Sequence, residues 1–401
     1  MRALDGTSSQ IAPEPAPDVD VSIVIPCLNE ADTLETCIDK AERALRANGL
    51  AGEIIVADNG STDGSQAIAL RRGTRLLAVR VRGYGAAIDA GIIAARSEFV
   101  VMGDGDDSYD FGDVPRFVAK LREGYDLVQG CRFRQGGGRI LPGAMPLLHR
   151  WIGNPLLSAL VRRMFCAPVT DVYCGLRGFR KTHYQRLDQR CIGMEFATEM
   201  VIKSTLYGGR IAEIPVTLHP DGRKSHAPHL KTFRDGWRTL RFFLMYSPRW
   251  LFLFPGLALV FVGLVGYALA LPGLTITGIT FDAHTLLFAS LAILCGYQSI
   301  QFAIFAKTFA INEGLMPVDA RMDRFFALVN LERGLAVAGA TLVVGMVLLG
   351  SAVVQWVGGG FGHLDYASTM RRVIPGVTLT ALGFQTILSS FFVSILGMHK
   401  R

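Results

Sequence analysis

The chain has 401 residues, half of them hydrophobic and 19% charged, with a formal net charge of +7 at pH 7. This length allows more than one domain. Residues 21–235 have ordinary globular composition, whereas the apolar residues are concentrated in residues 250–398. That distribution argues against a wholly soluble protein. It also gives no support to nucleic-acid binding, because basic residues in a membrane protein reflect topology and lipid contact.

The chain begins with a polar segment, residues 1–20, that is rich in Pro, Ala and Asp and has no apolar stretch. We expect a flexible tail there and no signal peptide. The seven cysteines form no CxxC pair and are odd in number. That pattern favours reduced thiols over a disulfide framework or a zinc site.

From residue 21 onward, short apolar runs alternate with stretches of helical spacing. The predicted strands are residues 21–26, 53–59, 74–80, 99–104 and 126–132, followed by strand-like residues 171–180 and 210–220. The predicted helices include residues 29–49, 83–97, 114–124, 149–165 and 193–209. This alternation predicts one α/β domain over residues 21–228, Rossmann-like, with a mostly parallel sheet covered on both faces.

Polar residues directly follow the predicted strands, where open α/β sheets bind their ligands. Asp104 and Asp106 form an Asp-x-Asp at the end of one strand. Carboxylate oxygens suit Mg²⁺ or Mn²⁺, which share their coordination with substrate phosphates. The alternative is a solvated acidic turn. Asp58 ends another strand and could accept hydrogen bonds from a nucleobase or ribose.

A nucleotide site would also need cations for the phosphates. The candidates are Arg132, Arg150, Arg177, Arg223 and Lys224. Arg150 and Asn154 are four residues apart on a predicted helix, so both could reach one phosphate.

Residues 229–249 predict a juxtamembrane amphipathic helix with cations on one face and apolar side chains beside them. This pattern is typical of a helix at the membrane interface, with an ordinary basic surface helix as the alternative. Four uncharged runs follow: residues 250–271, 285–306, 335–357 and 373–398. Each exceeds the ~20 residues needed to span a bilayer, so residues 250–401 predict four transmembrane helices.

Basic residues predict the orientation of these spans. They occur in the loop between residues 307 and 334 and at the C-terminus, whereas residues 272–284 contain no Lys or Arg. The positive-inside rule therefore places the N-terminal domain, this middle loop and the C-terminus in the cytoplasm. Arg371 and Arg372 run against the rule.

Five ordered motifs, PCLNEADTL, VADNGSTDGS, RGYGAAIDAGI, MGDGDD and GCRF, resemble those of the family 2 glycosyltransferases. Within that family they are most similar to polyprenyl-phosphate glycosyltransferases of the dolichol-phosphate mannose synthase type. The resemblance covers roughly residues 20–230. It implies a GT-A fold and an inverting hexosyltransferase that takes sugar from a GDP- or UDP-sugar and places it on a membrane polyprenyl phosphate.

The resemblance also implies roles on the donor side. Residues that would contact the nucleoside are Pro26, Asn29, Glu30 and Asp58. Asp104 and the catalytic Asp106 would hold Mg²⁺ or Mn²⁺ and the donor diphosphate. A segment that would close over the donor contains Arg223, Lys224 and Ser225. Ser108 stands where the mannose synthases usually have Gln, which leaves the metal coordination open at that position.

On the acceptor side, Arg132 matches an arginine that the family directs at the acceptor phosphate, and Arg150 with Asn154 matches a second phosphate-binding pair. Cys131 replaces the usual Ser before Arg132. A lipid phosphate is already anionic at neutral pH, so the reaction needs positioning and charge screening rather than a general base.

Other functions stay open on the sequence alone. A glycosyltransferase acting on another membrane lipid shares these features. A processive polysaccharide synthase would show Gln-x-x-Arg-Trp, where this chain has Tyr246 in YSPRW. A Rossmann oxidoreductase would need GxGxxG after the first strand. A lipid-linked-sugar flippase or scaffold is suggested by Gln298, Gln301 and Gln385 within the spans, although such residues commonly join helices. Homo-oligomerisation is also left open.

Overall fold

The computed structural model describes residues 19–224, 232–328 and 330–397. The chain divides into two compact units, Met1–Leu240 and Arg241–Arg401. Most of the expected flexible tail, and the predicted donor residue Ser225, lie outside the described residues.

The first unit is built on a seven-stranded sheet with the strand order β3-β2-β1-β4-β7-β5-β8. Its strands are β1 Val21–Cys27, β2 Gly52–Asp58, β3 Arg75–Ala78, β4 Phe99–Met102, β5 Leu127–Cys131, β7 Arg177–Arg180 and β8 Ile211–Pro215. All neighbouring strands run parallel except β7, which is antiparallel to both β4 and β5. The prediction of a mostly parallel, Rossmann-like sheet is confirmed.

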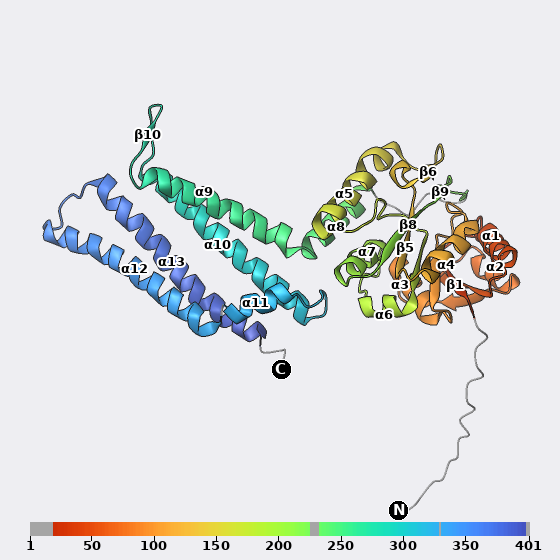
Figure 1. Ribbon diagram of the computed structural model, residues 1–401. Coiled ribbons are helices and arrows are strands. Elements are labelled where there is room, and N and C mark those ends of the chain that lie inside the picture. Colours follow the sequence, from red (N-terminus) through yellow and green to blue (C-terminus); the bar gives the residue numbers. More distant parts are fainter. Residues whose placement is uncertain (1–18, 225–231, 329, 398–401) are drawn as a thin grey trace, which may run out of the picture. The chain divides into compact units, whose positions relative to one another are not determined.

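Helices cover both faces of this sheet (Figure 1). They are α1 Leu34–Ala47, α2 Ser65–Arg71, α3 Tyr84–Ala94, α4 Val114–Arg122, α5 Asn154–Phe165, α6 Lys181–Leu187 and α7 Phe196–Leu206. Alternate residues of β1 face opposite ways: Ile23 and Ile25 join one core cluster with Leu34 of α1 and residues of α4. Val24 points to α3, where a Cβ at Gly91 would lie 2.4 Å from its side chain. Both faces of the central strand are therefore buried, which explains its continuous apolar sequence.

Residues 171–180 were predicted as strand-like, but only β7 is a strand. The side chain of Gln129 explains the difference, because its Nε2 donates to the carbonyl oxygens of Asp171 and Cys174 at 3.1 Å each. These carbonyls are bound by a side chain instead of by a neighbouring strand. The short strands β6 Arg139–Ile140 and β9 Thr217–Leu218 pair with each other in a separate small sheet.

The second unit contains four helices long and apolar enough to cross a membrane. They are Arg249–Ala270, α10 Ala283–Asn312, α12 Leu331–Gly358 and α13 Tyr366–Gly397. The first begins with a π-helical turn and continues as α9, Phe254–Ala270. The four predicted spans are confirmed. α10 and α13 are longer than predicted because polar residues at their ends continue the helix.

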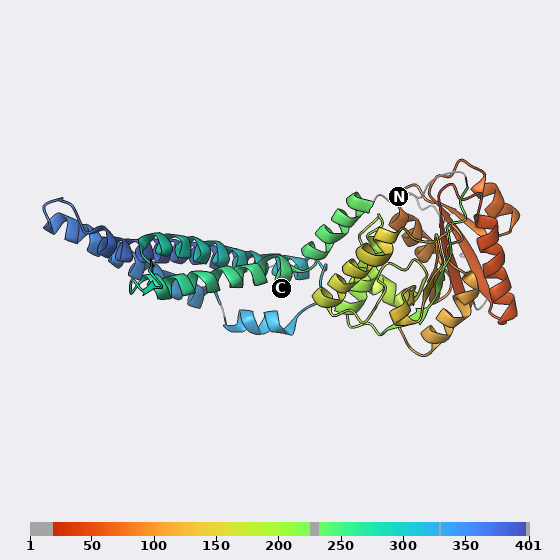
Figure 2. The same ribbon diagram turned by 90° about the horizontal axis from the view of Figure 1, so that it is seen from above.

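The long helices pack in the spatial order α9-α10-α13-α12 (Figures 1 and 2). Glycines allow the closest approaches. A Cβ at Gly256 of α9 would lie 2.8 Å from the carbonyl oxygen of Gly296 in α10, and one at Gly345 of α12 would lie 2.9 Å from that of Gly376 in α13. Small residues at such contacts are typical of helix pairs in membranes, where packing replaces the hydrophobic effect. The connections contain the hairpin β10–β11 (Thr275–Ile276 and Ile279–Thr280) and the short helix α11 (Ala320–Leu328).

The expected juxtamembrane helix is present as α8, Thr232–Met245. Its buried side chains include Phe242 and Phe243, whereas Trp237 is 63% exposed. Its placement at a membrane surface stays a prediction.

Candidate functional site

The site begins at the carboxyl edge of the parallel strands. β1 runs parallel to β2 on one side and to β4 on the other. Because the carboxyl ends of parallel strands meet at the same edge, the residues that follow them come together. Glu30, Asp58, Asp104 and Asp106 therefore lie along one edge of the sheet.

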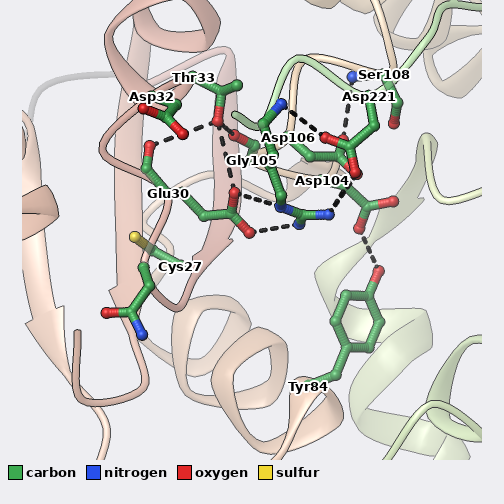
Figure 3. A network of polar contacts seen from close by, with 12 residues as sticks. Cys27, Glu30, Asp32, Thr33, Tyr84, Asp104, Gly105, Asp106, Ser108 and Asp221 are labelled. Atoms are coloured by element: carbon green, nitrogen blue, oxygen red, sulfur yellow. Dashed lines mark hydrogen bonds and ion pairs between the residues drawn. The ribbon is translucent and has the colours of Figure 1, made fainter. Parts of the chain in front are cut away.

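Acidic side chains at this edge converge on one guanidinium, that of Arg223. Figure 3 shows three of them, Glu30, Asp106 and Asp221. The Nε and Nη2 of Arg223 donate to the two carboxylate oxygens of Glu30 at 2.8 and 2.5 Å. Its Nη1 donates to Asp221 at 2.9 Å and lies 3.4 Å from Asp106 Oδ2. Burial alone would lower the pKa of Arg223, but the hydrogen bonds to Glu30 and the charges of Asp106, Glu30 and Asp221 raise it above its usual value. Arg223 thus supplies the positive charge that the acidic edge requires.

The segment that carries Arg223 is also fixed through its backbone. Gly222 N donates to the carbonyl oxygen of Asp106 at 3.0 Å. Lys224 N donates to Asp32 Oδ2 at 2.9 Å. The structure therefore brings the predicted residues Arg223 and Lys224 to the acidic edge.

Asp104 is held from two sides (Figure 3). The hydroxyl of Tyr84 donates to its Oδ1 at 2.8 Å. A Cβ at Gly175 would lie 2.2 Å from its Oδ2, so only glycine fits at that position without moving the carboxylate. Burial, and after it the negative charge of Asp106, raise the pKa of the Asp104 carboxyl to about 6. Asp104 is thus fixed in place with a charge that its surroundings do not balance.

The two carboxylates fit a divalent cation with oxygen ligands, because positive charge would relieve the repulsion between Asp104 and Asp106. Among the described residues, no group of three or more His, Cys, Asp and Glu side chains is arranged to hold a metal ion. The protein therefore offers part of a coordination shell, and substrate phosphates and water would complete it, as is usual for Mg²⁺. Ser108 contributes through its backbone N, which donates to Asp106 Oδ1 at 3.0 Å.

The residues predicted to contact the nucleoside are engaged in contacts within the protein. Pro26 lies in β1 and is buried. Asn29 has a φ of 62°, and its Oδ1 accepts a hydrogen bond from Thr62 N at 2.8 Å. Asp58 is 2% exposed and accepts from two backbone N–H groups of the following turn and from Gln66 Nε2. Asp58 therefore fixes this turn, and its contact with a nucleoside stays a prediction.

Arg132 forms a buried ion pair. Its Nε and Nη2 donate to the two carboxylate oxygens of Asp171 at 2.6 and 2.8 Å, and its Nη1 lies 3.4 Å from the Tyr109 hydroxyl. Arg132 is 6% exposed and Asp171 is fully buried. These contacts use three of the five N–H groups of the guanidinium, which leaves two for a phosphate. Ser158 of α5 accepts from Val172 N at 3.3 Å, which connects this pair to α5.

Arg150 and Asn154 lie where a π-helical turn, His149–Gly153, continues into α5. Such turns shift the following side chains around the helix axis and are frequent at functional sites. The Arg150 guanidinium lies 5.5 Å from the ring centroid of Trp151. The structure places both predicted phosphate ligands on one continuous helical segment, and their joint contact with a phosphate stays a prediction.

The same segment carries an exposed apolar face. Leu147, Trp151, Ile152 and Leu156 are 73, 70, 57 and 55% exposed. Their spacing places them on one side of the helix. An exposed apolar patch of this kind marks a surface that contacts a partner or a membrane.

The sequence analysis did not identify three residues of this site: Tyr84, Asp171 and Asp221. Tyr84 lies between two glycines at the start of α3, in the first helix after β3, so its position in the chain was a usable signal. Asp221 and Asp171 act only through partners, Arg223 and Arg132, that the fold brings to them.

Comparison with known proteins identifies the family. Residues 22–188 match the family described as glycosyl transferase family 2, and residues 304–397 match the glycosyltransferase family 2 C-terminal transmembrane region. The low-salt glycan biosynthesis hexosyltransferase Agl6 of Haloferax volcanii is 34% identical over 378 residues, which cover 94% of this chain and 89% of that protein. The chain is a family 2 glycosyltransferase.

Other relatives match about half of the glycosyltransferase. The dolichyl-phosphate hexose transferase of Haloferax volcanii is 29% identical over 49% of this chain and 82% of its own length. The undecaprenyl-phosphate 4-deoxy-4-formamido-L-arabinose transferase of Salmonella paratyphi B is 29% identical over 50% of this chain and 60% of its own. Among solved structures, glucosyl-3-phosphoglycerate synthase of Mycobacterium tuberculosis aligns with a TM-score of 0.46 and 25% identity, over 56% of this chain and 78% of that one.

These matches confirm the resemblance seen in the motifs. The chain is a glycosyltransferase of GT-A fold, and its matched C-terminal region together with the four apolar helices makes it a membrane protein.

Proposed function

We propose that this glycosyltransferase moves a hexose from a nucleoside-diphosphate sugar to the phosphate of a polyprenyl lipid, at the cytoplasmic face of the membrane. The observation that carries the proposal is the carboxylate pair Asp104–Asp106 at the carboxyl edge of the sheet, crossed by Arg223 3.4 Å from Asp106. The printed names of two relatives, which specify dolichyl phosphate and undecaprenyl phosphate, support a polyprenyl phosphate as the acceptor.

On the donor side, Asp104 and Asp106 would hold Mg²⁺ or Mn²⁺, which supplies positive charge to the leaving diphosphate. Arg223 and Lys224 would bind diphosphate oxygens. Because Arg223 is paired with Glu30 and lies beside Asp106, it must turn from these carboxylates toward the diphosphate when the donor binds. The nucleoside, GDP or UDP, would lie toward the loops after β1 and β2, where Asn29 and Asp58 are placed.

On the acceptor side, Arg132, Arg150 and Asn154 would hold the lipid phosphate. One phosphate oxygen attacks the anomeric carbon of the sugar, and the bond from that carbon to the donor's β-phosphate oxygen breaks. The nucleoside diphosphate leaves with the bonding electrons, and the configuration at the anomeric carbon inverts. The attacking oxygen is already anionic, so no side chain has to remove a proton. The work of the protein is to hold two anions close together in line.

Two features of the catalytic unit suit an acceptor that stays in the bilayer. The apolar face formed by Leu147, Trp151, Ile152 and Leu156 lies on the segment that carries Arg150. The helix α8 carries exposed Arg238 and Arg241, which suit contact with phosphate headgroups.

Arg371 and Arg372, which run against the positive-inside rule, both contact neighbouring side chains. Arg371 Nη2 lies 3.2 Å from Asp282 Oδ1, and Arg372 Nη1 donates to Gln355 Oε1 at 2.9 Å. The positive-inside rule counts Lys and Arg rather than net charge, so these two arginines still run against it, and the more numerous basic residues of the loop between α10 and α12 outweigh them. This supports the cytoplasmic placement of the catalytic unit and the C-terminus.

A transfer assay with purified full-length protein tests the proposal. The protein is incubated with Mg²⁺ or Mn²⁺, undecaprenyl phosphate and each member of a panel of radiolabelled GDP- and UDP-sugars. We expect one donor to transfer label into the organic phase, and Asp106→Asn to abolish that transfer. Transfer that persists in the variant would contradict the assigned role of Asp106, and absence of transfer from every donor would contradict the acceptor assignment.

A further inference from the structure

A cavity of about 860 Å³ lies inside the second unit. Its walls come from the last part of α10, the start of α12 and the end of α13, with α11 on the remaining side. Along α13 the lining runs from Thr386 to Gly397, a rise of about 16 Å. That is about half of the ~30 Å hydrocarbon core of a bilayer. The cavity therefore extends from one end of the bundle to about the middle of the membrane.

The cavity has polar residues at several depths, on α10, on α13 and at the N-cap of α12. Its polar residues, in order from the end of the bundle inward, are Asn330, Ser394, Ser390, Ser389 and Gln301. At the bottom, the hydroxyls of Tyr297 and Thr386 are 2.5 Å apart and satisfy each other. A purely hydrocarbon ligand would contact the apolar part of the lining but would leave these polar groups without a partner, because it has no group that accepts or donates hydrogen bonds.

Gln301 indicates what kind of group the ligand has to supply. It is only 8% exposed, lines the cavity, and its Nε2 has no hydrogen-bond partner among the described residues. A buried amide donor is unfavourable unless an acceptor is present. The ligand that fits must therefore place a hydrogen-bond acceptor near mid-membrane depth.

The lining also contains three aromatic rings, those of Phe305 of α10 and of Phe325 and Phe326 of α11. A pocket with flat apolar walls and a few convergent polar groups binds ligands that have both apolar faces and hydroxyl groups. A sugar ring has both. At the same end of the bundle, Arg321 and Arg324 on α11 and Arg333 on α12 are exposed, where they suit a phosphate at the membrane surface.

We propose that this cavity binds the glycosyl headgroup of the lipid-linked product, with the sugar inside, the phosphate at the cationic end and the polyprenyl chain in the surrounding lipid. The identity of the lipid rests on the proposed function. The site is separate from the catalytic edge of the sheet, so the protein would bind the product of its own reaction at a second place.

Equilibrium binding to the full-length protein in lipid nanodiscs tests this proposal, with ready-made lipids as probes. Hexosyl-phosphoryl-undecaprenol and undecaprenyl phosphate are titrated in parallel and the bound lipid is quantified by native mass spectrometry. We expect Gln301→Leu to weaken binding of the hexosyl lipid about three- to tenfold, the value of one hydrogen bond, and to leave undecaprenyl phosphate binding unchanged. Ser394→Phe, which fills the cavity, should abolish binding of the hexosyl lipid.

Gln298→Leu is the matched control, because Gln298 is on the same helix, is exposed and does not line the cavity. We expect it to bind both lipids as the wild type does. If Gln301→Leu loses binding of both lipids equally, the cavity binds the polyprenyl chain rather than the sugar. If neither cavity variant changes binding, the cavity does not bind these lipids. Either result overturns the proposal. Because the lipids are supplied ready-made, the two proposals fail separately: wild-type protein that transfers sugar but does not bind the hexosyl lipid refutes this site alone, whereas missing transfer refutes the proposed function.

Discussion

Replacing Arg223 with Gln should make the empty donor site bind Mn²⁺ more tightly. The guanidinium lies 3.4 Å from Asp106 Oδ2, and the two side chains are 12% and 15% exposed. At that distance the Coulomb attraction is about 5 kcal/mol with an effective dielectric constant of 20. Desolvation and solvent screening reduce the net value, and we take about 1–2 kcal/mol. If Arg223 and the metal compete for Asp106, removing Arg223 should raise the affinity about 5- to 30-fold.

The assay is Mn²⁺ titration of full-length protein without nucleotide, with free Mn²⁺ measured by electron paramagnetic resonance. Lys224→Gln is the matched control, because it also removes one positive charge, from the next residue in the chain. The contact of Lys224 with Asp32 is made by its backbone N, which the substitution keeps. We expect Lys224→Gln to change the affinity less than twofold at 0.15 M salt, where distant exposed charges are screened. If Arg223→Gln binds Mn²⁺ no more tightly than the wild type, Arg223 does not compete with the metal and the reasoning is wrong.

Three further predictions each concern a single buried or closely packed residue. Asp171→Asn leaves the buried charge of Arg132 without its partner, so we expect the free energy of unfolding to fall by about 3–5 kcal/mol, measured by denaturant titration. Gly175→Ala should displace the Asp104 carboxylate and lower kcat about 100-fold with the thermal midpoint retained, because its Cβ would lie 2.2 Å from Oδ2. Burial lowers the pKa of His183, so the folded state takes up its proton less readily than the unfolded chain. Stability should therefore fall as the pH drops below about 6.5, and His183→Asn should flatten that slope in thermal melts at pH 5 to 8.

Local patterns in the sequence were sufficient to predict the main helices and strands of the fold. The parallel strands β1, β2 and β4 were signalled by short apolar runs, and the polar residues after them marked the binding edge. Asp104 and Asp106 were found this way because they directly follow β4. The membrane helices were equally clear, since a long uncharged run has few alternative structures.

Partners far apart in the chain could not be predicted in the same way. Arg223 meets Glu30 across 193 residues, and Arg132 meets Asp171 across 39. Such pairs depend on how the elements pack, and no local pattern encodes them. The irregular segment before β7 was missed for a related reason, because the buried side chain of Gln129 binds its carbonyls. Tyr84 was missed although its place at a helix start after a strand marked it.

The most direct test of the proposed function compares two acceptors that differ only in the phosphate. Full-length protein receives the active nucleotide-sugar with undecaprenyl phosphate in one reaction and undecaprenol in the other. The proposal requires transfer to the phosphate alone, because the residues Arg132, Arg150 and Asn154 are assigned to hold an anionic nucleophile and no side chain is assigned to activate an alcohol. Equal or greater transfer to undecaprenol would contradict that assignment.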